Sequence, residues 1–105
     1  MNALNSLIIE GHIVDVDVNE KNIIFTIDTS RTYKDSKGQE ITDHYEFKVL
    51  CFMVEHKQWF TRGRGVRIVG RLKQNKWFDE KWHSEVIIVA EHIEFKPTVS
   101  KQVSD

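Results

Sequence analysis

The stretch GVRIVGRLKQ (Gly65–Gln74) alternates between apolar and basic side chains, as a β-strand does when one of its faces is covered. Successive side chains of a strand point to opposite faces. One face therefore carries Val66, Ile68, Gly70 and Leu72. The other carries Arg67, Val69, Arg71 and Lys73. We predict a strand whose apolar face lies in the core and whose basic row points outward.

The same periodicity predicts four more strands along the chain. They cover Asn5–Val18, Ile23–Asp28, His44–Val54 and Ser84–Phe95. Gly11, inside the first of them, indicates a bulge or a sharp bend. In the third predicted strand the better core face consists of Tyr45, Phe47, Val49, Cys51 and Met53.

The connecting segments complete the predicted order of elements. Thr29–Asp43 is polar and is expected to form a long exposed loop or a flexible hairpin, and Asn75–Trp82 a turn. Glu55–Arg62 is the one plausible helix, of at most two turns, with Gly63 as its C-terminal cap.

Five strands with a short helix between the third and fourth is the element order of an OB-fold, a five-stranded Greek-key barrel in the all-β class. Periodicity alone also permits a small β-sandwich. We expect one domain over residues 1–96 and a short flexible tail over residues 97–105.

Composition excludes several classes of function. The N-terminal segment lacks the features of a secretory signal, and no apolar run is long enough for a membrane span, so a cytoplasmic protein is expected. Cys51, the one cysteine, is expected to be buried and inert. The five histidines show no metal-ligand spacing, and we find no catalytic constellation. We therefore predict no catalytic residues, no metal and no cofactor.

Basic residues are concentrated in one part of a chain whose net charge is only −1. Lys57–Phe78 contains no acidic residue and seven basic ones, namely Lys57, Arg62, Arg64, Arg67, Arg71, Lys73 and Lys76. Trp77, Phe78 and Trp82 adjoin this run. Cations beside exposed aromatic rings suit single-stranded nucleic acid, whose phosphates are charged and whose bases stack. Alternatively, Trp77 and Trp82 clasp each other across a hairpin.

For two more aromatic residues the sequence allows two structural roles each. Tyr33 lies between basic neighbours in the polar segment and is either a surface residue or a ligand contact. Phe52 shares a strand face with Glu46 and Lys48, so it is either partly exposed or part of a second core layer against the helix.

Three stretches resemble the first, fourth and fifth strands of bacterial single-stranded DNA-binding proteins. They are NSLIIEG (Asn5–Gly11), GRGVRIVGRLKQNKW (Gly63–Trp77) and VIIVAEHIEF (Val86–Phe95). The resemblance extends, with gaps, over residues 5–95. It implies an OB-fold that assembles into homotetramers and wraps single-stranded DNA. It also implies a role in DNA replication, repair or recombination, at the nucleoid in the cytoplasm.

The resemblance also implies site residues. Tyr33, Phe52 and Trp77 match base-stacking positions of the family, and Trp82 falls near a further aromatic position. Lys34, Lys48, Arg62, Lys73 and Lys76 match positions that are commonly basic. With the other arginines of the basic run, the expected phosphate contacts are Lys34, Lys48, Arg62, Arg64, Arg67, Arg71, Lys73 and Lys76.

The sequence departs from the family pattern at several points. Glu46 occupies the remaining stacking position, between Tyr45 and Phe47, where a carboxylate repels phosphate unless Lys48 or the strand register compensates. The first hairpin and the helix are shorter than in the family. The sequence also shows no acidic C-terminal tail, so we expect a short form that does not recruit repair proteins through such a tail.

The leading hypothesis is thus a homo-oligomeric protein that binds single-stranded DNA, as a tetramer or a dimer. The alternative is a dimeric assembly protein, similar to primosomal replication protein N, that bridges replication partners. A third hypothesis, an oligonucleotide-processing enzyme, predicts turnover of labelled DNA, and we expect none.

Overall fold

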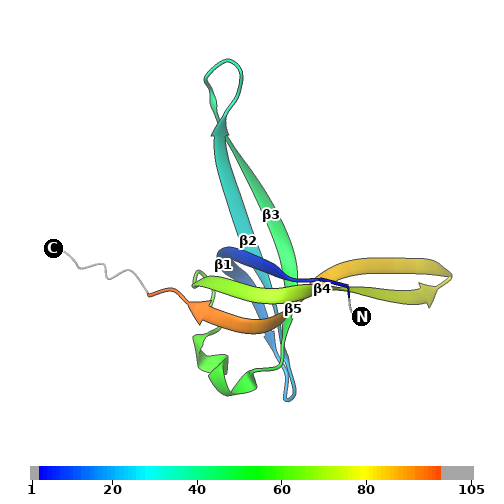
Figure 1. The fold of residues 1–105 in the computed structure, drawn as a ribbon. Coiled ribbons are helices and arrows are strands. Elements are labelled where there is room, and N and C mark those ends of the chain that lie inside the picture. The colour runs from blue at the N-terminus through cyan, green and yellow to red at the C-terminus, as the bar shows by residue number, and fades with distance from the viewer. Residues whose placement is uncertain (1–2, 98–105) are drawn as a thin grey trace.

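The computed structural model describes residues 3–97, which form a closed barrel with the strand order β1-β2-β3-β5-β4 (Figure 1). The elements are β1 (Leu7–Val18), β2 (Ile23–Lys34), β3 (Glu40–Cys51), the 3-10 helix η1 (Val54–Trp59), β4 (Gly65–Asp79) and β5 (Lys81–Phe95). All neighbours pair antiparallel except β3 and β5, which pair parallel. The prediction of an all-β, five-stranded barrel with a short helix between the third and fourth strands is confirmed.

The barrel interior is filled by β-branched and aromatic side chains from all five strands. Its fully buried members include Ile13, Ile23, Phe25, Ile27, Val49, Cys51, Val66 and Ile68. Phe60, which follows η1, packs edge-on against Phe25 and Phe95, with ring centroids 5.2 and 5.0 Å away. Cys51 is buried as predicted, and this burial raises the pKa of its thiol.

Two glycines allow backbones to approach closely where the sheet bends into a barrel. β1 pairs with β4 as far as His12 and with β2 from His12 onward. A Cβ on Gly11 would lie 2.6 Å from the Asp28 carbonyl oxygen. Gly11 therefore marks a bend, as predicted, while the bulge itself falls between Ile13 and Asp15. A Cβ on Gly70 would clash with the Val89 carbonyl.

Two hairpins continue beyond the barrel as arms (Figure 1). The β2–β3 arm comprises residues 29–47, and the β4–β5 arm comprises residues 71–87. Thr29–Asp43 thus forms a hairpin rather than a long loop, and only residues 35–39 connect its strands. The Asp35 Oδ1 atom accepts bonds from the Lys37 and Gln39 N–H groups, each 2.9 Å long.

The predicted turn over Asn75–Trp82 is wrong. Strand pairing continues as far as Asp79 and Lys81, so Glu80, with a φ of 63°, is the one residue between the strands. The segment is polar and aromatic because both faces of the arm meet solvent. Its backbone groups are nevertheless satisfied by pairing, which polarity alone does not reveal.

The helix prediction needs two corrections. The helix is a 3-10 helix over Val54–Trp59, and Phe60 rather than Gly63 is its C-terminal cap. Gly63 has a φ of 86° in the turn that follows, and its N–H donates to the Ile13 carbonyl at 2.7 Å. Gly63 therefore has the left-handed conformation that glycine favours, but it forms the turn that leads to β4 and does not cap the helix. No helix in residues 3–97 is long and apolar enough to cross a membrane.

The predicted core face of the third strand is only half correct. Val49 and Cys51 are buried, but Tyr45 and Phe47 are 47% and 40% exposed. They share the alternation of Val49 and Cys51, yet they lie on the arm, where no second layer covers them. Leu72, predicted to be in the core, is exposed on the other arm for the same reason.

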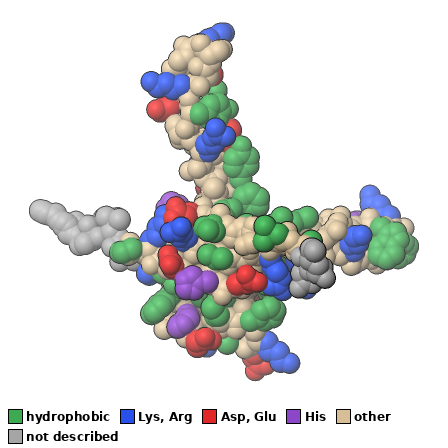
Figure 2. Space-filling model, viewed as in Figure 1, with side chains coloured by type: hydrophobic (Ala, Val, Ile, Leu, Met, Phe, Trp, Pro, Cys, Tyr) green, Lys and Arg blue, Asp and Glu red, His purple; other side chains and the backbone are tan. Residues whose placement is uncertain are grey.

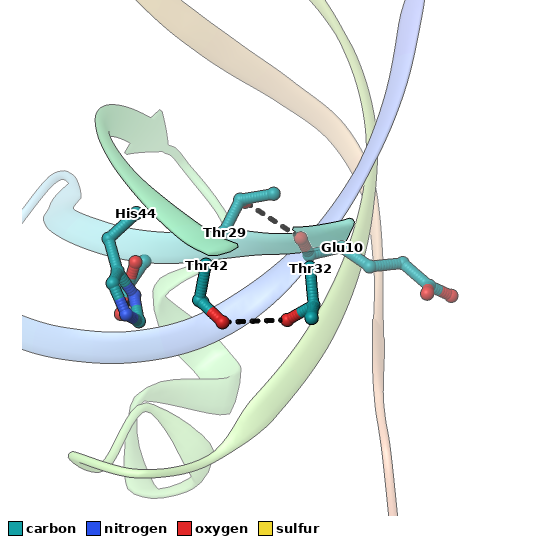
Figure 3. A network of polar contacts seen from close by, with 6 residues as sticks. Glu10, Thr29, Thr32, Thr42 and His44 are labelled. Carbon is teal, nitrogen blue, oxygen red and sulfur yellow. Dashed lines mark hydrogen bonds and ion pairs between the residues drawn. The ribbon is translucent and has the colours of Figure 1, made fainter. Parts of the chain in front are cut away.

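Polar contacts join the β2–β3 arm to the barrel and its two strands to each other (Figure 3). The Thr29 hydroxyl donates to the Glu10 carbonyl at 2.8 Å, and so ties β2 to β1 where their pairing ends. Farther along the arm, the hydroxyls of Thr32 and Thr42 bond across the ribbon at 2.9 Å. Each contact supports a ribbon of two strands, which alone is marginally stable in water.

We expect Gly70→Ala to destabilise the barrel by about 2 kcal/mol or more, because the new methyl group meets backbone that cannot move aside. Gly65→Ala is the matched control. Its Cβ would meet the flexible Lys96 side chain at 3.2 Å, so we expect a loss under about 1 kcal/mol. Urea denaturation measures both, and equal losses would contradict the role given to Gly70.

Candidate nucleic-acid interface

The outward surface of β3, β5 and β4 gathers four of the predicted contact residues. Lys48 on β3 and Arg71, Lys73 and Trp77 on β4 all alternate with the side chains that point into the barrel. The Lys48 Nζ atom lies 3.4 Å from Glu85 Oε1 on β5, so the outward faces of these strands are continuous. We call this surface the outer face.

Trp77 lies on the outer face of the β4–β5 arm and is stacked on His83. Their ring centroids are 5.3 Å apart and their planes differ by 12°. The His83 Nε2–H group donates to the Asp79 carbonyl at 3.3 Å, which fixes the imidazole beside the indole. Trp77 remains 44% exposed. Sequence reasoning missed His83, because only the register shows that it lies opposite Trp77.

Trp82 lies on the opposite face of the same arm. It pairs with Phe78, at a centroid distance of 5.5 Å and an interplanar angle of 71°, so the predicted clasp with Trp77 is wrong. Trp82 is 72% exposed. A pocket of about 450 Å³ adjoins it, lined by Gln74, Lys76, Trp82, His83 and Ser84. Figure 2 shows hydrophobic and basic side chains together at the end of this arm.

Phe52 and Tyr33 are exposed at the two ends of the β2–β3 hairpin. Phe52, which follows β3 directly, is 59% exposed, so the alternative that placed it in a second core layer is wrong. Tyr33 lies near the tip of the β2–β3 arm, and the Arg31 guanidinium is 5.6 Å from its ring centroid. Lys34 is the last residue of β2.

Most arginines of the basic run contact carboxylates from other parts of the chain. Arg62 lies 3.6 Å from Asp15, and Arg71 lies 3.2 Å from Glu91. Arg67 reaches Glu10 at 4.0 Å. These pairs are exposed, and an exposed ion pair contributes only about 0–1 kcal/mol. They therefore leave the arginines able to exchange a carboxylate for a phosphate.

Arg64 has a different environment from the other predicted phosphate contacts. Its Nε–H group donates to the Lys96 carbonyl at 2.9 Å, and its guanidinium lies 5.5 Å from the Phe95 ring centroid. Arg64 thus holds the end of β5 against the segment after η1. In contrast, Lys34, Lys73 and Lys76 form no ion pair with any residue of the 3–97 range.

Glu46 projects from the outer face of β3, in register with Asp28. Lys48 does not neutralise it, because the Lys48 ammonium pairs with Glu85. Tyr45 and Phe47 point to the other face of the ribbon. The Tyr45 hydroxyl donates to Asp43 Oδ2 at 3.2 Å, and this bond to a carboxylate raises the pKa of the phenol.

The described part of the chain holds no group of three or more His, Cys, Asp or Glu side chains placed to bind a metal ion. Aromatic rings are exposed on both arms, beside Arg31 on one and Lys76 on the other.

Comparison with known proteins identifies one family. The model of the single-strand binding protein family matches residues 4–96. A single-stranded DNA-binding protein of Aquifex aeolicus is 34% identical over 73 residues, which cover 66% of this chain and 50% of the relative. The chain therefore spans half the length of this curated relative.

Solved structures share the fold at low sequence identity. A Plasmodium falciparum single-stranded DNA-binding protein, solved as a complex with single-stranded DNA, superposes with a TM-score of 0.79 at 16% identity, over 92% of this chain and 98% of that chain. The small single-stranded DNA-binding protein of Streptomyces coelicolor gives a TM-score of 0.65 at 19% identity, over 91% and 96% of the two chains. Both similarities support the OB-fold.

Proposed function

The chain belongs to the single-strand binding protein family, and we propose that it binds single-stranded DNA independently of base sequence. The family consists of DNA-binding proteins that are not enzymes. The observation that supports the proposal most directly is the exposure of aromatic rings beside lysines on two arms that project from one barrel.

We propose that Tyr33, Phe52, Trp77 and Trp82 stack on bases. An exposed indole or phenyl ring in water is an unfavourable surface, and a base covers it without regard to its identity, because every base has a π-face. His83 supports Trp77 from behind, so the indole is held in place before DNA arrives. Such preorganisation reduces the entropy lost on binding.

The phosphate backbone is proposed to contact Lys34, Lys48, Arg62, Arg67, Arg71, Lys73 and Lys76. Arg64 is the weakest member of the predicted set, because its guanidinium already binds the Lys96 carbonyl. The near-zero net charge does not oppose this proposal, since the local field at a groove guides a ligand more than the total charge does.

We also propose a role in DNA replication, repair or recombination, at the nucleoid in the cytoplasm, where single strands of DNA are produced. A protein that covers single strands without sequence preference serves any of these processes.

The first prediction concerns Trp77. We expect Trp77→Ala to weaken binding of oligo-dT roughly 5- to 100-fold, because one stacked base is worth about 1–3 kcal/mol. Fluorescence anisotropy of a labelled oligonucleotide measures the affinity. Trp59, which stacks on His56 within η1, is the control, and Trp59→Phe should bind like wild type. Unchanged affinity in Trp77→Ala would remove Trp77 from the interface.

The second prediction concerns phosphate contacts. If about four phosphates are neutralised per protomer, log K should fall with log[salt] at a slope near −3. Lys73→Ala should make this slope less steep by about 0.7, the share of one contact. Lys21→Ala removes the same charge from the turn between β1 and β2 and should leave the slope unchanged. Equal slopes for the two variants would exclude Lys73 as a phosphate contact.

The third prediction concerns assembly. Residues 7–9 of β1 pair with β4 on one side, and no described strand pairs with them on the other, so this edge is open to a second copy. Exposed Ile8 lies on this segment. We propose a homo-oligomer, with a tetramer favoured over a dimer, and light scattering measures its mass. A dimer with weak oligo-dT affinity would instead favour the alternative, an assembly protein that bridges replication partners.

A further inference from the structure

The two faces of the β2–β3 arm differ sharply in chemistry. Residues opposite each other in the ribbon share a face, and the register assigns every residue to one of two sets. One set, which we call the aromatic face, contains Arg31, Tyr33, Ile41, Asp43, Tyr45 and Phe47. The other set, which we call the carboxylate face, includes Asp28, Lys34, Glu40, His44, Glu46 and Lys48.

Between its two lysines, Lys34 near the tip of the arm and Lys48 near the barrel, the carboxylate face is a poor surface for nucleic acid. It carries three carboxylates, on Asp28, Glu40 and Glu46, and two lysines. One of these lysines, Lys48, already pairs with Glu85. Asp28 Oδ2 contacts the His44 ring at 3.2 Å, and the described part of this face on the arm carries no tyrosine, phenylalanine or tryptophan. A phosphate that approached here would meet negative charge and no stacking surface.

The aromatic face has the opposite properties. Tyr33 is 38% exposed, and Tyr45 and Phe47 are similarly accessible although they share a strand face with the buried Val49 and Cys51. Its charges are those of Arg31, whose guanidinium lies near the Tyr33 ring, and Asp43. Asp43 accepts a bond from the Tyr45 hydroxyl, and a phenol is neutral at pH 7, so Tyr45 adds no negative charge.

The spacing of the rings also suits a single strand of DNA. Alternate residues of a β-strand are roughly 6.6 Å apart, so Tyr45 and Phe47 leave β3 at about that interval. Stacked bases repeat at about 3.4 Å along a strand. A ring inserted between two consecutive bases occupies one such layer and separates them by about 6.8 Å. Tyr45 and Phe47 therefore match the interval at which a strand accepts successive rings.

We propose that single-stranded DNA crosses the β2–β3 arm on the aromatic face, with Tyr45 and Phe47 stacking on bases together with Tyr33. Glu46 then points away from the bound strand and does not repel it. This inference rests on the proposed function and adds two binding residues that lie on either side of Glu46.

The path is continuous with a surface of the other arm. Val49 on β3 is in register with Ile88 on β5, so Phe47 leaves the barrel beside the start of the β4–β5 arm. The face of that arm that continues from the buried Ile88 carries Val86, Lys76 and Trp82. A strand that leaves Phe47 thus meets a cation and an indole, which are two of the contact residues proposed above.

Alanine substitutions on adjacent residues of β3 test the proposal, because adjacent residues point to opposite faces. Tyr45→Ala and Phe47→Ala should each weaken oligo-dT binding roughly 5- to 100-fold. Glu46→Ala, between them, is the matched control and should bind as tightly as wild type or slightly tighter. Circular dichroism and thermal melting verify folding. If Phe47→Ala fails to fold, Phe47→Leu keeps the apolar volume, removes the ring and should show the same loss.

Three results would overturn the inference. The first is wild-type affinity in Tyr45→Ala and Phe47→Leu, whatever the affinity of Glu46→Ala. The second is a change of mass in solution for Tyr45→Ala with affinity per protomer retained, which would make the aromatic face a contact between copies of the chain. The third, a wild-type protein that does not bind oligo-dT, would overturn the proposed function as well. The first two leave that function intact.

Discussion

A contact of only two residue pairs closes the barrel. Val49 and Leu50 of β3 lie in register with Ile88 and Val89 of β5, the one parallel pairing in the described sheet. On the N-terminal side of this contact the two strands separate, and each stays paired with its own hairpin partner. Both arms therefore begin at the closure. Beside this contact, Gly70 lets β4 and β5 approach closely.

The closure also decides which part of each strand is core and which part is surface. Alternation predicts correctly that Tyr45 and Phe47 share a face with Val49 and Cys51. It does not show where the second layer ends, because a side chain at a core-facing position is buried only if another element covers it. The same limit applies to Leu72 and to the predicted turn over Asn75–Trp82. Fold class and strand faces could thus be predicted from the sequence, whereas the arms depend on where two distant strands meet.

The basic run is a second feature that the sequence shows only in part. Its arginines lie near acidic residues distant in sequence: Arg62 meets Asp15, Arg67 meets Glu10 and Arg71 meets Glu91. Folding thus offsets much of the local charge excess, while Lys73 and Lys76, which form no ion pair in the described range, project from the β4–β5 arm. Because exposed pairs are weak, a polyanion can displace their carboxylates. The density of basic residues along the sequence therefore overstates the unpaired positive charge at the barrel. The fold, rather than the sequence, shows where the unpaired charge lies.

Glu46 shows why a binding site cannot be transferred from a family by position alone. The side-chain period of a strand is two, so a shift of one residue turns a side chain to the other face. The family's stacking position falls on Glu46, but the rings on this strand are at Tyr45 and Phe47, one residue to either side. Position-by-position matching counts this as the loss of an aromatic residue. In terms of faces, the arm keeps its aromatic surface and presents it on the side that continues into the barrel interior, away from three carboxylates. Under the proposed function, the face that carries the rings, and not the aligned position, determines how this arm binds DNA.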